Sequence, residues 1–96
     1  MAEPIALRVL TGDGLALEDQ ATSIIAPGER GYVGFLSHHA PLVTTLSPGT
    51  LTWQRLSGER RTRRIGSGLL EMAQNRCTLL TDEVSERSGT EAATAR

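Results

Sequence analysis

The chain has 96 residues, of which 39% are hydrophobic and only three are aromatic, and its formal net charge is −1. That length suits one domain, since domains usually hold about 100–150 residues. The near-neutral charge argues against a protein that binds nucleic acid or membrane surfaces wholesale. The single cysteine, Cys77, excludes an internal disulfide and a cysteine-based metal cluster.

The sequence shows no segment for export or membrane insertion. No apolar run reaches the about 18–20 residues of a membrane span, and the first ten residues lack the basic start and long apolar stretch of an export signal. We therefore expect a soluble, cytoplasmic chain.

Short apolar and β-branched runs between turn residues predict an all-β chain. Ile5, Leu7 and Val9 alternate with other residues in the period of two that a half-buried strand shows. Turn signals recur closely enough to predict a β-sandwich or flattened barrel of nine or ten strands. The sandwich domain is expected at 1–84, and 85–96 is expected to be a polar tail or the start of a truncated helix. The expected strands lie at 5–9, 15–17, 22–26, 32–36, 42–46, 50–56, 61–65, 69–73 and 76–81.

Two patterns resemble sites of chemistry but lack what that chemistry requires. Gly28, Gly31 and Gly34 recur every third residue, yet they neither open a helix nor precede a lysine, as phosphate-binding glycine loops do. Turns and one strand glycine explain them better. His38 and His39 diverge in an extended chain, and the sequence has no third histidine to complete a metal site.

Cys77 lies in an apolar strand with no base nearby in the sequence, so we expect a buried structural thiol rather than a nucleophile. Nothing in the chain assembles a nucleophile, a base and an oxyanion site. We therefore expect no catalytic residue, no metal site, no cofactor and no enzymatic activity of the chain itself.

Arginines gather in a predicted hairpin beside a single acid, Glu59. In a strand, Arg61 and Arg63 face one way and their neighbours the other. Such a hairpin could follow phosphates, although it lacks the aromatics that stack on bases. A solvated edge that blocks pairing with another sheet is the interpretation that the sequence favours. One functional alternative is thus a free-standing β-sandwich that binds RNA or an acidic protein through this hairpin. The five arginines are Arg55, Arg60, Arg61, Arg63 and Arg64.

The stretch APGERGYVGFLSHHAPLVTTLSPGTL, residues 26–51, resembles the first domain of the epsilon subunit of F-type ATP synthase. That domain typically has an Ala-Pro-Gly turn, then Gly-x-x-Gly, then His-Ala-Pro-Leu, and Pro-Gly before the next strand. GSGLLEM at 66–72 is similar to the family's Gly-Gly-Phe-x-Glu-Val, and NRCTLLTDE at 75–83 to its Asn-x-Val-Thr-Val-Leu-Ala-Asp. The pieces occur in the family's order and spacing between Ile5 and Val84.

The resemblance implies a non-catalytic rotor subunit of the central stalk, which links the gamma subunit to the ring of c subunits and helps to couple ion translocation to ATP synthesis. It implies a peripheral place on the cytoplasmic face of the bacterial inner (plasma) membrane, and no nucleic-acid partner. The implied gamma contacts are Thr11, His39, Pro41, Leu42 and Thr44, and the implied c-ring contacts are Glu29, Arg30, Gly31 and Tyr32.

Some positions depart from the family pattern. Ser67 replaces a glycine of the Gly-Gly pair, Ser37 and His38 stand where Pro-Gly is usual, and Tyr32 stands where an acidic or polar residue is frequent. The chain ends at Arg96, where the first helix of the family's C-terminal hairpin would scarcely have begun. We therefore expect a subunit without that inhibitory hairpin and without the family's ATP site.

Overall fold

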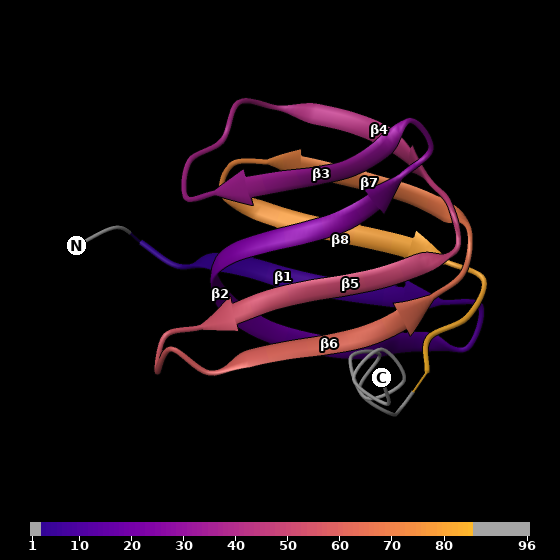
Figure 1. Cartoon of the computed structure of the whole chain (residues 1–96), viewed down its shortest axis with the longest axis horizontal. Helices are drawn as coiled ribbons and strands as arrows, with labels where there is room; N and C mark the ends of the chain where they lie inside the picture. The colour runs from indigo at the N-terminus through magenta and orange to yellow at the C-terminus, as the bar shows by residue number, and fades with distance from the viewer. Residues whose placement is uncertain (1–2, 86–96) are drawn as a thin grey trace.

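The computed structural model describes residues 3–85, which form eight β-strands and no helix (Figure 1). Within that range, accordingly, no helix is long and apolar enough to cross a membrane. The all-β prediction is confirmed. The strands are β1 (Ile5–Thr11), β2 (Gly14–Gly28), β3 (Gly31–Leu36), β4 (Leu42–Leu46), β5 (Gly49–Arg55), β6 (Arg60–Ile65), β7 (Gly68–Ala73) and β8 (Arg76–Thr81).

The number of strands is eight rather than nine or ten. The two short strands expected at 15–17 and 22–26 belong to one strand, β2, which has 15 residues. Its polar middle, Glu18–Gln20, pairs with β1 and so stays extended despite having few apolar side chains. The tail expected at 85–96 lies outside the described residues, apart from Ser85.

The long strand β2 joins two layers of sheet. Its first half pairs with β1, and its second half lies between β3 and β5. An irregularity between Ala21 and Ser23 marks where the strand passes from one layer to the other. The first layer holds β4, β7, β8, β1 and the first half of β2; the second holds β3, the second half of β2, β5 and β6 (Figure 1).

Aliphatic side chains from both layers fill the space between them. Ile5, Leu7 and Val9 are fully buried, as the period of two predicts, and β1 lies between β8 and β2. Leu51 and Trp53 point inward together from β5. The domain is therefore closed around one aliphatic core that contains one tryptophan and one phenylalanine.

Cys77 is a buried structural thiol, as expected. It points into the core with Leu79, and burial raises its pKa to about 12. At neutral pH the group is therefore the thiol, not the nucleophilic thiolate.

The connections between strands divide into two ends of the molecule. One end, which lies on the right of Figure 1, is here called the β2–β3 end. It holds the connections β1–β2, β2–β3, β4–β5 and β6–β7. The β3–β4, β5–β6 and β7–β8 connections lie at the other, the β3–β4 end. There Asn75 accepts a 2.7 Å hydrogen bond from the His38 backbone N–H and donates one of 3.0 Å to the Pro4 carbonyl. These bonds hold three distant segments together.

Candidate functional site

The four residues expected to face the c-ring form one exposed turn at the β2–β3 end. Glu29 and Arg30 make the turn, and Gly31 and Tyr32 begin β3. The Glu29 N–H donates to the Thr45 carbonyl at 3.0 Å, and the Thr45 hydroxyl donates to the Glu29 carboxylate. The turn is thus fastened to β4 and holds a fixed position.

The five residues expected to contact gamma do not gather in one place. His39 and Pro41 lie in the β3–β4 connection, whereas Thr11 ends β1 at the opposite, β2–β3 end (Figure 1). Leu42 and Thr44 pair with the buried residues Met72 and Leu70, so their side chains point inward from β4. Of the expected gamma contacts, the two on β4 therefore face the core rather than the outer surface.

The outward side chain of that segment is Val43, which is 66% exposed. It belongs to the outer face of the first layer, where it lies opposite Glu71 of β7. The alternation of side chains along a strand was the signal that could have identified it, once Leu46 was assigned to the core.

An exposed apolar row crosses this outer face. Leu69 of β7 lies opposite Leu80 of β8, which lies beside Leu10 of β1, and Leu10 lies opposite Leu15 of β2. Leu69 is 49% exposed and Leu80 is 53% exposed. Sequence analysis did not single out these four leucines, because strands far apart in the chain bring them together. Contiguous exposed apolar surface of this kind marks interaction sites.

The row beside it is polar apart from Val43 at its β4 end. Val43 of β4 lies opposite Glu71, Glu71 opposite Thr78, and Thr78 beside Arg8. The Arg8 guanidinium lies 3.7 Å from the Glu18 carboxylate on β2. The outer face of the first layer thus combines an apolar row near the β2–β3 end with a largely polar row beside it, and protein-binding surfaces combine apolar and polar side chains in this way.

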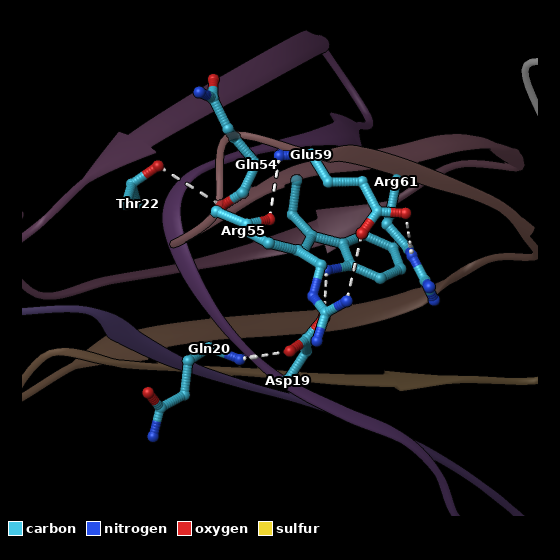
Figure 2. Close-up of polar contacts among 9 residues, drawn as sticks. Asp19, Gln20, Thr22, Gln54, Arg55, Glu59 and Arg61 are labelled. Carbon is cyan, nitrogen blue, oxygen red and sulfur yellow. Dashed lines mark hydrogen bonds and ion pairs between the residues drawn. The ribbon is translucent and has the colours of Figure 1, made fainter.

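Two acids, Asp19 and Glu59, pair with Arg55 and Arg61 of the arginine hairpin (Figure 2). The Arg55 side chain lies 3.1 Å from the carboxylates of both Asp19 and Glu59, and Arg61 lies 3.1 Å from Glu59. The Asp19 carboxylate also accepts a 2.8 Å hydrogen bond from the indole N–H of Trp53. Sequence analysis missed Asp19, which lies on β2 far from the hairpin in the chain.

The strand arrangement predicted for β6 is correct. Arg61 and Arg63 lie opposite the buried Trp53 and Leu51, and the Arg63 guanidinium lies over the Trp53 ring, 5.9 Å from its centroid. Arg60 and Arg64 are exposed. Because three of the five arginines are engaged within the domain, the alternative of an RNA-binding or acid-binding hairpin is not supported.

The environment of Asp19 lowers its pKa below the ordinary value of 3.8. Partial burial raises the pKa. The hydrogen bonds from Trp53 and from the Gln20 N–H, together with the charges of Arg55 and Arg61, lower the pKa by more than burial raises it. The folded protein therefore favours the carboxylate more strongly than the unfolded chain does. This stabilisation is complete above the unfolded pKa and disappears as the pH falls through the folded one.

We expect Asp19→Asn to lower the free energy of unfolding by about 1–2 kcal/mol at pH 7, because a charge-assisted acceptor is lost. It should also flatten the loss of stability between about pH 5 and pH 3. Urea unfolding followed by Trp53 fluorescence at each pH measures both. Asp13→Asn, at the exposed β1–β2 turn, is the matched control and should keep the wild-type slope; an unchanged slope in Asp19→Asn would contradict the prediction.

Residues 4–87 match the model of a family described as "ATP synthase, Delta/Epsilon chain, beta-sandwich domain". The chain belongs to this family. Among its relatives, the ATP synthase epsilon chain of Moorella thermoacetica is 37% identical over 82 residues, covering 85% of this chain and 60% of that protein. The epsilon chain of Chloroflexus aurantiacus is 40% identical over 81 residues, covering 84% and 58%. This chain therefore spans about 60% of the length of those relatives.

Solved structures show the same fold. A chain in the Euglena gracilis mitochondrial ATP synthase structure containing OSCP, F1 and the c-ring aligns with a TM-score of 0.81 at 23% identity, covering 96% of this chain and 61% of that one. A chain in the Tetrahymena thermophila ATP synthase central stalk and c-ring structure aligns with a TM-score of 0.69 at 16% identity, covering 86% and 66%. The two-layered β-sandwich is thus the fold of this family.

Proposed function

We propose that this domain is a non-catalytic rotor component of a bacterial F-type ATP synthase. It packs against the gamma subunit through the apolar row and faces the c-ring with the β2–β3 turn. In that position it transmits rotation between the ring and the stalk, and it helps to couple ion translocation to ATP synthesis. The complex holds it peripherally on the cytoplasmic face of the membrane.

The apolar row is the observation that carries the proposal. Four leucines on four adjacent strands, Leu69, Leu80, Leu10 and Leu15, form a continuous stripe with a largely polar row beside it, on a sheet whose other face is the core. A subunit that must not slip under torque needs a broad, rigid, desolvated contact, and a packed two-layer sheet supplies the rigidity.

The second contact is supported by the fastening of the β2–β3 turn. Backbone and side-chain bonds tie Glu29 to Thr45, and the Tyr32 hydroxyl accepts a 3.1 Å hydrogen bond from the Thr50 N–H. The turn is thereby linked to both layers, so force applied there passes directly into the sandwich.

Co-expression with the gamma subunit of the same genome tests this function. We expect a one-to-one complex that survives gel filtration in about 0.5 M salt, since exposed charge pairs are screened at that ionic strength while apolar contacts are not. Adding purified c-ring in detergent should then give a ternary complex. A folded chain that forms no complex with gamma at any salt concentration would overturn the proposal.

A further inference from the structure

Strand β3 is an edge strand with one side open. Among residues 3–85 its only neighbour is β2, with which it pairs from Ser23–Leu36 to Gly28–Gly31. Gly34, in the middle of β3, is exposed. An extended strand with an open side can accept another strand.

The backbone groups of alternate β3 residues face that open side. Pro27 lies opposite Tyr32 and has no N–H to give, so this pair is a non-hydrogen-bonded pair of the β2–β3 ladder. By the alternation of the ladder, Tyr32, Gly34 and Leu36 turn their N–H and C=O groups away from β2. The Leu36 carbonyl does so, since it accepts a 3.2 Å bond from the His39 N–H in the β3–β4 connection.

Side chains leave the open side accessible. The Tyr32 ring leans the other way, over β2, because its hydroxyl meets the Thr50 N–H on β5. Gly34 adds nothing to the outer face, and a Cβ built on it would meet only the Ile24 carbonyl oxygen, at 3.9 Å. Ile25, opposite Gly34, and Leu36 are exposed apolar neighbours.

The two edges of the second layer differ in charge. The β6 edge carries Arg60, Arg61, Arg63 and Arg64, and charged side chains discourage strand addition. The range Gly31–Leu36 contains no charged residue, no proline and no bulge. Of the two edges, β3 is therefore the one suited to pairing.

We propose that β3 pairs antiparallel with β3 of a second copy of this chain, about a twofold axis at Gly34. In this register Gly34 lies opposite Gly34 of the second copy, and Tyr32 lies opposite its Leu36. All three residues that face outward then meet three of the same kind, and the Leu36 carbonyl, which already accepts from the His39 N–H, takes a second hydrogen bond on its other lone pair. The second layers of two molecules join into one continuous sheet.

Charges at the ends of the strand favour a second copy as the occupant. Continued two residues past the end of β3, the register sets Arg30 of one molecule against His38 of the other, whose imidazole lies 3.4 Å from the Glu3 carboxylate of its own chain. The twofold axis repeats this contact, so each copy supplies a cation and an anion. Self-pairing is thus complementary in charge at both ends and neutral in between.

The association should be weak. One strand pair with few apolar side chains buries less than the about 1,200 Å² at which stable interfaces begin, so we expect a dissociation constant between about 10 µM and 1 mM. The edge begins at the β2–β3 turn, so a dimer would cover part of the surface proposed to face the c-ring. The dimer is therefore a state of the free subunit.

Sedimentation equilibrium of the 96-residue chain over that concentration range tests the proposal. Wild type should shift from monomer to dimer, and Gly34→Ala should do the same, since Cβ atoms fit at this position. Gly34→Lys places two like charges at the twofold axis and should weaken the dimer at least tenfold. Mixing Gly34→Lys with Gly34→Glu should restore a dimer, which a variant that had lost its fold could not do.

Val43→Lys is the matched control, because it puts the same charge on the outer face of the other layer. It should leave the dissociation constant unchanged. A wild-type chain that stays monomeric at about 1 mM would overturn the proposal. So would a Gly34→Lys dimer as tight as wild type. A dimer abolished by Val43→Lys would also overturn it, because the contact would then lie on the outer face of the first layer.

Discussion

Replacing Gly68 by alanine is expected to unfold most of the protein, or to lower its free energy of unfolding by at least about 3 kcal/mol. A Cβ at this position would overlap the Leu80 carbonyl oxygen of β8, at a separation far below van der Waals contact. It would also lie 2.8 Å from the Thr81 Cα. Both are backbone atoms, so no side chain can turn aside. The strand β7 would have to move off β8.

Such a movement would break more than one contact. Gly68 pairs with Thr81 on one side and with Leu46 of β4 on the other, and the Thr81 hydroxyl donates a 2.9 Å hydrogen bond to the Ser67 carbonyl. Urea unfolding monitored through Trp53, which is buried, gives the loss of stability. Gly12→Ala is the control, because a Cβ there has no atom within 4 Å. If the free energies of unfolding of Gly68→Ala and Gly12→Ala differed by less than about 1 kcal/mol, the prediction would be wrong. The close approach of β7 and β8 would then not explain the glycine at position 68.

Local patterns were sufficient to predict much of the fold. The period of two in Ile5–Val9 and the shared face of Leu51 and Trp53 follow from strand geometry alone, and burial confirms both. The turn at Gln74-Asn75 is also where the sequence indicated it, and both residues adopt positive φ, 52° and 59°. Asparagine tolerates that conformation better than most residues.

Contacts between distant segments could not be obtained in this way. Glu59 was visible as the acid beside the arginines, but Asp19 joins them only because β2 runs past β5. The apolar row has the same origin, since Leu69, Leu80 and Leu10 come from three strands whose order in the sheet is β7, β8, β1. Periodicity assigns a residue to a face of its strand, whereas the pairing of strands decides which residues share a surface.

Introducing charge into the apolar row should abolish the proposed complex with gamma while leaving the domain folded. The double variant Leu69→Glu with Leu80→Glu puts two like charges opposite each other at the centre of the row. Burying them against gamma without partners would cost about 3 kcal/mol or more, which corresponds to an at least hundredfold weaker complex. Both side chains are about half exposed in the free domain, so its own stability should fall by no more than the about 1 kcal/mol that like charges directly opposite each other cost. Titration calorimetry with purified gamma measures the affinity.

Leu36→Glu is the matched control, since Leu36 is 67% exposed but lies on β3 in the second layer. It should bind gamma like wild type. If Leu36→Glu lost gamma and the double variant kept it, gamma would dock on the second layer, where it would compete with pairing at β3. Because the apolar row and the β3 edge lie on different layers, the two sets of variants separate the contact with gamma from the contact between two copies of the chain. The proposed rotor function requires the contact with gamma and does not depend on pairing between two copies.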